Sequence, residues 1–197
     1  MRRLIVHTWM TLDGVSQAPG APEEDTSGGF AHGGWHLPYF DDTSRTWVVD
    51  SYAAAGGFLF GRRTFESLAG YWPNASEEEQ AIAEPLNTRP KYVASTTLTE
   101  PLAWQPSTVL KGDVAEAVRA LKQQDGGDLL VVGSTMLVQA LIGHGLVDEL
   151  QLMLDPLLVG GGKRIFPDDG GRRPLRLLDS QATSTGAILA TYAPAEA

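Results

Sequence analysis

The stretch LLVVGSTMLVQALI, residues 129–142, decides the fold of this chain. Its first four residues are consecutive apolar side chains, which is typical of a short strand buried on both faces. Gly133 follows, and the hydroxyls of Ser134 and Thr135 stand where a helix needs its N-cap. From Met136 onward, apolar residues recur with the period of one helix face. The stretch therefore predicts a strand, a glycine turn and a helix.

This junction has two interpretations. A glycine lets a ligand approach the backbone, and a helix N-terminus carries partial positive charge, so together they suit a phosphate or pyrophosphate. Alternatively, Gly133 only supplies the geometry of an ordinary turn. The other junctions of the chain favour the first interpretation.

The composition indicates one globular domain spanning residues 1–197. Of these residues, 43% are apolar and 20% are charged, which is enough for a core and argues against disorder. The absence of cysteine excludes disulfides, thiolate nucleophiles and cysteine-bound zinc. Four scattered histidines favour no metal site, and a net charge of −9 without a long basic run argues against nucleic acid as a partner.

We expect a cytoplasmic protein that does not bind a membrane. The apolar runs are too short for a membrane span, and the first residues, MRRLIVHTW, lack a signal-peptide core and cleavage site.

Strands and helices are predicted to alternate as far as residue 145. The expected strands are residues 4–9, 58–60, 91–95, 108–110 and 129–132, and the expected helices are residues 42–55, 64–69, 76–86, 114–124 and 136–142. Residues 147–154 then alternate polar and apolar, as in a half-exposed strand, and residues 175–182 and 187–193 predict two last strands. This order predicts a parallel sheet with helices on both faces and antiparallel strands at one edge.

Residues suited to phosphate follow several expected strands. They are Gly61, Arg62, Arg63 and Thr64 after the second strand, Ser95, Thr96 and Thr97 after the third, and Lys111 after the fourth. Arginine forks match phosphate oxygens, and ligands of parallel sheets bind at the carboxyl ends of the strands. The sequence therefore predicts a phosphate-binding site there, although the two arginines could instead form a solvated basic turn.

Residues 16–38 are predicted to form a long loop without regular structure, because glycine and proline are frequent and aliphatic residues are few. A loop of this length is usually functional or mobile. It carries the acidic run Glu23, Glu24 and Asp25. Its aromatic residues, including Trp35, either cover a pocket or pin the loop to the body.

Four segments together resemble the dihydrofolate reductase superfamily. They are LIVHTWMTLDGV at 4–15, FLFGRRTFE at 58–66, VVGSTMLVQALI at 131–142 and VDELQLMLDPLLVGGGKRIF at 147–166. More closely, the chain is similar to stand-alone relatives of the C-terminal reductase domain of the bifunctional riboflavin-biosynthesis deaminase-reductase. The resemblance spans nearly the whole chain. It implies a three-layer α-β-α fold, a mainly parallel central sheet with antiparallel C-terminal strands, NADPH as the cofactor, and a homodimer.

The resemblance also implies which residues meet the cofactor. Those expected to border the nicotinamide are Thr8, Trp9, Leu12, Asp13 and Gly14. Those expected to hold the pyrophosphate and the adenosine side are Gly61, Arg62, Arg63 and Thr64. Those expected to meet the pyrophosphate from the other side are Gly133, Ser134, Thr135 and Met136, and Val132 is a further expected cofactor contact. Ser95 and Thr96 are expected near the 2′-phosphate, with Lys111 as a further cofactor contact.

A reductase also needs a proton, and the sequence offers Asp41, Asp42, or a water held by Thr8 or Thr11. Both aspartates could instead cap the helix that begins there. The deaminase half of the bifunctional relatives has zinc chemistry that needs paired cysteines, so we expect reductase activity alone.

We therefore expect an NADPH-dependent reductase that transfers a hydride to a pyrimidine riboside resembling 5-amino-6-ribosylaminouracil phosphate, or to a pterin-like substrate. Trp35, Lys163 and Arg164 are the expected substrate contacts. The alternative is a nucleotide-binding sensor or carrier that keeps the NADPH pocket without catalysis.

Overall fold

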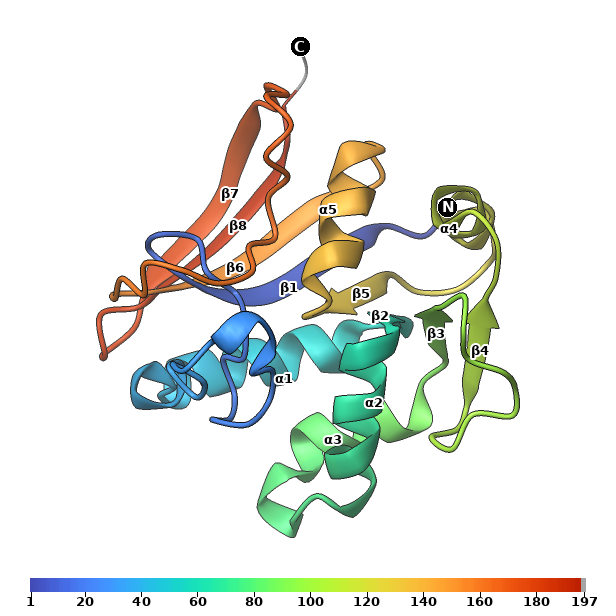
Figure 1. The fold of residues 1–197 in the computed structure, drawn as a ribbon, viewed down its shortest axis with the longest axis horizontal. Helices are drawn as coiled ribbons and strands as arrows, with labels where there is room; N and C mark the ends of the chain where they lie inside the picture. The colour runs from blue at the N-terminus through green and yellow to red at the C-terminus, as the bar shows by residue number, and fades with distance from the viewer. Residues whose placement is uncertain (196–197) are drawn as a thin grey trace.

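The computed structural model describes residues 1–195 and contains an eight-stranded sheet between two layers of helices (Figure 1). The strands are β1 (Leu4–Thr11), β2 (Gly57–Gly61), β3 (Lys91–Ala94), β4 (Ser107–Leu110), β5 (Leu129–Val132), β6 (Glu149–Asp155), β7 (Leu175–Ala182) and β8 (Ile188–Pro194). The helices are α1 (Asp42–Ala54), α2 (Arg62–Tyr71), α3 (Gln80–Thr88), α4 (Val114–Lys122) and α5 (Thr135–Gly143). Short 3₁₀ turns are η1 (Ser27–Gly29), η2 (Leu37–Tyr39), η3 (Trp72–Asn74) and η4 (Glu77–Glu79).

The strand order is β4-β3-β2-β5-β1-β6-β8-β7. In this order, the six strands from β4 to β6 are parallel to one another. Strand β8 is antiparallel to β6, and β7 is antiparallel to β8. The predicted three-layer fold with a mainly parallel sheet and antiparallel C-terminal strands is therefore confirmed. The parallel order places the carboxyl ends of five neighbouring strands, β4 to β1, along one edge.

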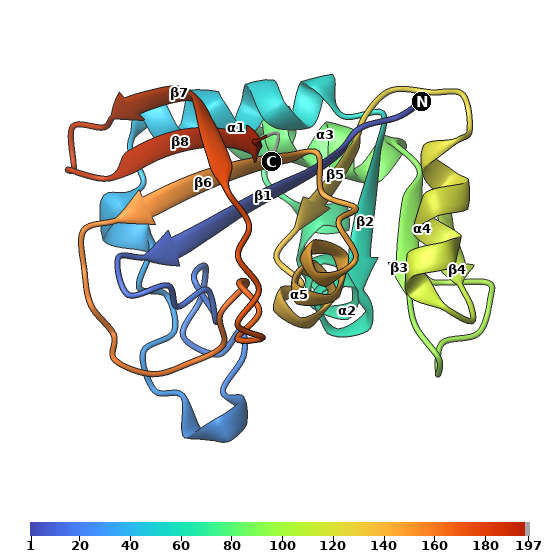
Figure 2. The same cartoon turned by 90° about the horizontal axis from the view of Figure 1, so that it is seen from above.

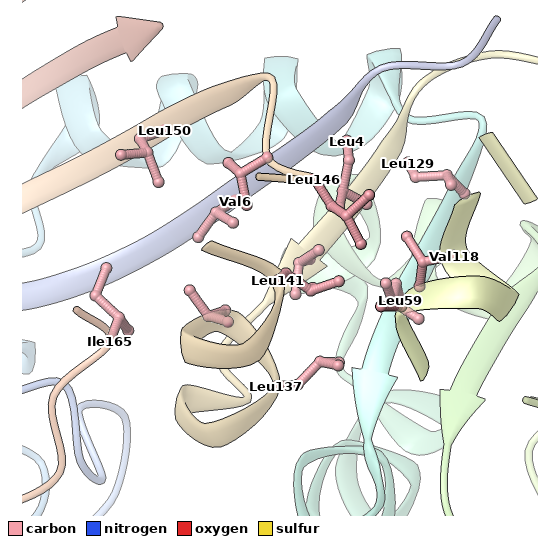
Figure 3. Close-up of a cluster of buried hydrophobic side chains, with 14 of the residues drawn as sticks. Leu4, Val6, Leu59, Val118, Leu129, Leu137, Leu141, Leu146, Leu150 and Ile165 are labelled. Atoms are coloured by element: carbon pink, nitrogen blue, oxygen red, sulfur yellow. The ribbon is translucent and has the colours of Figure 1, made fainter. Parts of the chain in front are cut away.

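Two apolar cores hold the layers together. On one face, side chains of α4 and α5, such as Val118 and Leu141, pack on the inner strands with Leu4, Val6 and Leu59 (Figure 3). On the other face, α1, α2 and α3 cover Phe58, Phe60 and their neighbours. The unbroken apolar run of β5 is buried on both faces, as its sequence predicts.

Strand β6 differs from its prediction as a half-exposed strand. Its burial is nearly complete, because Leu150 and Leu152 join the core under α5 while Met153 packs with Ala187 and Leu189 on the opposite face. Its polar residues have partners as well, since Glu149 pairs with Arg3. The polar residues that alternate with apolar ones in β6 therefore indicate polar partners inside the protein, and they do not indicate a face exposed to solvent.

Between β1 and α1 the chain forms the predicted long loop, interrupted only by η1 and η2. Trp35 is buried and its indole N–H donates to the carbonyl of Gln17 at 2.7 Å, so this aromatic residue joins the two ends of the loop to each other. Within residues 1–195, no helix has the length and apolar character that crossing a membrane requires.

Candidate functional site

A long cavity of about 1130 Å³ follows the carboxyl ends of the parallel strands. Its walls run from the end of β4 across β3, β2 and β5 to β1, and then into the loop after β1. In Figure 2, α2 and α5 lie beyond the arrowheads of β2 and β5. The expected cofactor residues that line the cavity are Thr8, Trp9, Gly61, Arg62, Arg63, Thr64, Ser95, Thr96, Val132, Gly133, Ser134, Thr135 and Met136.

Two hydroxyl groups join the turns at the middle of the cavity. The backbone N–H of Gly61 donates to Ser134 Oγ at 2.9 Å, and the N–H of Ser134 donates to Thr64 Oγ1 at 3.1 Å. Ser134 adopts the left-handed conformation, with φ of 62°, directly after Gly133, whose φ is 57°. The β2–α2 and β5–α5 turns are thus held in one fixed arrangement.

This arrangement corrects the capping role that the sequence predicts for Ser134. Ser134 does occupy the N-cap position of α5, but its side chain makes no cap hydrogen bond because its hydroxyl bonds to Gly61 N–H and the Val132 carbonyl instead. At α2 the N-cap is Gly61, which has no side chain. Two helix N-termini therefore reach the same cavity without a side-chain cap, and their free N–H groups suit an anion.

The arginines begin α2 rather than preceding it, because that helix starts at Arg62 instead of Thr64. Arg62 lies 3.3 Å from Glu66, in a pair whose two side chains are 43% and 47% exposed, so the pair contributes little stability. Arg63 is exposed and forms no ion pair or side-chain hydrogen bond within residues 1–195. Positive charge at the first turn of α2 is therefore available to a ligand.

At one end of the cavity lie Ser95, Thr96 and Thr97 after β3, and Gly112 and Asp113 after β4. The Ser95 hydroxyl accepts from the N–H groups of Thr97 and Leu98 at 3.2 and 3.0 Å, which fixes this turn. Lys111 precedes Gly112 and is exposed, but it does not line the cavity.

At the other end, Thr8 and Trp9 of β1 meet the long loop. Thr8 Oγ1 lies 3.1 Å from Ser16 Oγ, and the Ser16 hydroxyl donates to the carbonyl of Trp9 at 2.6 Å. The Thr8 side chain is therefore part of a fixed hydroxyl pair. Gln17, Ala18 and further loop residues continue this wall.

The turn after β1 does not line the cavity, in contrast to the expectation for Leu12, Asp13 and Gly14. The Asp13 carboxylate accepts from the N–H groups of Val159 and Gly160, at 3.2 and 2.7 Å. The Thr11 hydroxyl lowers the pKa of Asp13 to about 2, and both N–H groups act in the same direction. Asp13 therefore fastens this turn to the segment after β6.

Asp41 and Asp42 also lie outside the cavity. Asp41 caps α1 by accepting from Ser44 N–H at 2.9 Å, and its second oxygen accepts from the N–H and hydroxyl of Ser184. The Ser184 hydroxyl and the Ser44 N–H hold the pKa of Asp41 well below its usual range. Asp42 is an exposed residue in the first turn of α1. Neither aspartate is therefore part of the proposed site.

Of the three expected substrate contacts, Lys163 alone lines the cavity. Its ammonium pairs with Asp25 and donates to Ser27 Oγ at 2.7 Å. Arg164 is exposed and its Nε donates to the carbonyl of Asp13 at 3.1 Å. Trp35 is buried and does not line the cavity.

The structure adds residues that the sequence did not single out. Those of the long loop are Ser16, Gln17, Glu24 and Asp25. The acidic run was visible, but no local pattern separates Glu24 from Glu23, which lies outside the cavity. Within the described residues, no cluster of three or more histidine, aspartate or glutamate side chains could hold a metal ion.

Comparison with known proteins supports the resemblance. The profile of the RibD C-terminal domain family matches residues 2–189. An uncharacterized protein of Bacillus subtilis (strain 168), YyaP, is 29% identical over 136 residues, which are 68% of this chain and 71% of YyaP.

Two solved structures share the fold. One is a Shewanella sp. PV-4 protein provisionally assigned to riboflavin biosynthesis, with a TM-score of 0.69, 20% identity, and coverage of 98% of this chain and 99% of that one. The other is the diaminohydroxyphosphoribosylaminopyrimidine deaminase/5-amino-6-(5-phosphoribosylamino)uracil reductase of Thermotoga maritima, with a TM-score of 0.65 and 14% identity. Their alignment covers 98% of this chain but 57% of the Thermotoga chain.

Proposed function

Because this chain belongs to the RibD C-terminal domain family, we propose that it is an NADPH-dependent reductase. The hydride acceptor is a pyrimidine riboside resembling 5-amino-6-ribosylaminouracil phosphate, or a pterin-like heterocycle. We place this activity in the cytoplasm, as expected from the sequence.

The observation that carries the proposal is the pair of uncapped helix N-termini at the middle of the cavity. The N–H groups at the start of α2 and α5, together with Arg62 and Arg63, provide donors and positive charge for a pyrophosphate. The volume of about 1130 Å³ exceeds the roughly 300–1,000 Å³ of ordinary small-molecule pockets, so a dinucleotide and a second molecule have room. The residues present therefore fit NADPH.

In this assignment the adenosine side lies at Ser95 and Thr96, and the nicotinamide side at Thr8 and Trp9, because the cavity crosses the strands in that order. NADPH supplies the hydride. The chain supplies fixed orientation through the Gly61–Ser134–Thr64 hydrogen bonds, and Trp9 lines the far end of the cavity.

The substrate lies next to Trp9, between the long loop and Lys163. A substrate phosphate has to compete with Asp25 for the Lys163 ammonium, whereas a heterocycle without phosphate leaves that pair intact. Arg164 would have to release the carbonyl of Asp13 to contribute. Binding of a phosphorylated riboside therefore requires the Asp25–Lys163 pair to open, and binding of a pterin-like heterocycle does not.

The test of the proposed function is the oxidation of NADPH by the purified protein with each acceptor class in turn. Oxidation that requires an acceptor supports the reductase. Binding of NADPH without turnover across a broad panel of reducible heterocycles supports the sensor or carrier instead.

We also infer that the chain forms a homodimer through the outer part of the sheet, beyond α5 (Figure 1). The register places Leu175 and Leu177 of β7 on the same face as Ile188 and Tyr192 of β8, and the first three are 42–50% exposed. The charged residues of β7 pair with Ala193 and Thr191 and lie on the other face. An exposed apolar face without charge is what the core of a dimer interface requires.

A further inference from the structure

The loop after β1 and the segment after β6 lie together beyond the arrowheads of their strands (Figure 2) and close the substrate end of the cavity. The charged side chains that line this end are Glu24, Asp25 and Lys163. Asp25 and Lys163 neutralise each other, and Asp25 also accepts from the Ser27 hydroxyl. Glu24 has no such cationic partner within residues 1–195.

The carboxyl group of Glu24 is held in place by its own loop. Its Oε2 accepts from the backbone N–H of Gly20 at 2.7 Å and from that of Ala21 at 3.3 Å. Its Oε1 has no hydrogen bond to any described residue. One oxygen therefore fixes the group, and the other is free for a molecule in the cavity.

Glu24 and Asp25 have opposite electrostatic environments although they are neighbours in the chain. Crowding by protein atoms raises the pKa of Glu24, and the charge of Asp25 adds to this, while the N–H groups of Gly20 and Ala21 and the nearby His36 oppose it. Burial also raises the pKa of Asp25, but Lys163 and Ser27 outweigh it and bring the pKa below its usual value. Two carboxyl groups whose pKa values are driven apart are the usual arrangement for an acid beside a fixed charge.

We propose that Glu24 donates the proton that completes reduction of the substrate. This inference rests on the proposed function. In a pterin, or in the ring-opened imine form of the riboside, bound NADPH would supply a hydride to the carbon of a C=N bond, the π electrons would move to the nitrogen, and NADP⁺ would remain. The Glu24 carboxyl then forms the N–H bond with its proton and becomes a carboxylate, which solvent reprotonates because the residue retains exposed surface.

Other acidic groups are less suitable. Glu66, a residue of α2, lines the cavity but pairs with Arg62. Asp41 and Asp42 lie outside the cavity. Glu24 therefore has both the place and the free oxygen that proton donation to a substrate requires.

The first test reads Glu24 directly, without turnover. Carboxyl carbons of ¹³C-labelled glutamate are followed by NMR from pH 3 to 8, and Glu24→Gln and Glu23→Gln each remove one signal and so assign it. We expect Glu24 to titrate at higher pH than an ordinary glutamate, and its signal to move when dihydrofolate or 5-amino-6-ribosylaminouracil phosphate is added to the NADP⁺ complex. A Glu24 signal that titrates at the ordinary pH of a glutamate and does not move with either acceptor overturns the proposal.

The second test separates this inference from the proposed function. Glu24→Gln keeps an oxygen for the Gly20 N–H, so we expect NADPH affinity within about 2-fold of wild type but turnover lower by roughly 10²–10⁴-fold. Glu23→Gln is the matched control and retains wild-type turnover. Turnover of Glu24→Gln at the wild-type rate rejects Glu24 as donor and leaves the reductase intact, whereas wild-type protein that fails to bind NADPH rejects both.

Discussion

Individual hydroxyl groups hold the turns that form the middle of the pocket. Ser134 and Thr64 are 70 residues apart in the chain, yet the hydroxyl of Thr64 accepts from the backbone of Ser134, and the hydroxyl of Ser134 accepts from Gly61. Each bond gives a backbone N–H of these turns a protein acceptor in place of water. The α2 and α5 N-termini are therefore held in place before any ligand arrives.

Replacing Ser134 with alanine removes the acceptor of the Gly61 N–H. We expect the free energy of unfolding to fall by about 1–3 kcal/mol, because a partly buried donor loses its partner. NADPH affinity should fall as well, since the two turns are no longer joined. Urea denaturation measures the first effect, and Thr99→Ala, at an exposed residue between β3 and β4, is the control. Unchanged stability and affinity would show that the hydroxyl bridge has no such role.

Asp41→Asn tests the structural role assigned to that carboxylate. The folded-state pKa lies below the unfolded value of about 3.9, so its charge stabilises the fold above that pH, and the contribution is lost as the pH falls towards the folded-state pKa. The variant should have a lower urea midpoint than wild type at pH 7, and the difference should shrink at pH 3. Turnover should be unaffected. A large loss of turnover with normal stability would return Asp41 to the site.

Sequence patterns predicted which residue types meet at the strand ends but not which hydrogen bonds they form. The N-cap alternative for Asp41 could be read locally, because Ser44 follows three residues later. The partners of Ser134 and of Asp13 could not, because they come from segments 73 and 147 residues away.

One buried amide, that of Gln17, holds the long loop in place. Gln17 Nε2 donates to the carbonyls of Asp25 and Ser27 at 2.9 and 3.0 Å, and its Oε1 accepts from Lys163 N–H at 3.0 Å. The Gln17 side chain thereby joins three parts of the substrate end. The loop wall that carries Glu24 depends on these contacts.

Gln17→Ala should therefore loosen the loop without affecting the nucleotide turns. We expect faster amide hydrogen exchange at Lys163, a raised KM for substrate, and NADPH affinity within about 2-fold of wild type. The loss of stability should be about 1.5–4.5 kcal/mol, from roughly 0.5–1.5 kcal/mol for each of three bonds. Gln181→Ala on exposed β7 is the control. Equal exchange at Lys163 in both variants would contradict this role.

Elements with a strong local pattern were predicted closely, and those whose burial depends on distant partners were not. The bounds of β5 were predicted correctly from its apolar run. The predicted half-exposure of β6 was wrong, because Met153 is covered by Ala187 and Leu189, which come more than 30 positions later in the chain.

At the scale of the whole molecule, the alternation of strands and helices predicted the parallel sheet, but it does not specify the neighbours of each strand. The order β4-β3-β2-β5-β1 lines up turns from five separate segments into one cavity. The same order leaves the β7–β8 face at the edge, beyond the cover of α5 (Figure 1).

Leu177→Lys tests the homodimer, because it places a charge in the apolar face of β7. We expect sedimentation equilibrium to show a dimer for wild type and a monomer for the variant at the same concentration. Leu37→Lys, at a leucine of similar exposure in the long loop, should remain a dimer. A wild-type monomer at micromolar concentration would reject the interface.

We expect the α2 and α5 turns to bind the pyrophosphate of NADPH. A fluorescence titration with NADPH, and with NADH in parallel, of wild type, Arg63→Ala and Arg172→Ala tests this binding. We predict tighter binding of NADPH than of NADH by wild type. Arg63→Ala should weaken NADPH binding by roughly 10- to 150-fold, which corresponds to about 1.5–3 kcal/mol for a charged hydrogen bond, while the distant Arg172→Ala should not. Binding of neither nucleotide, or equal binding by all three proteins, would contradict the assignment.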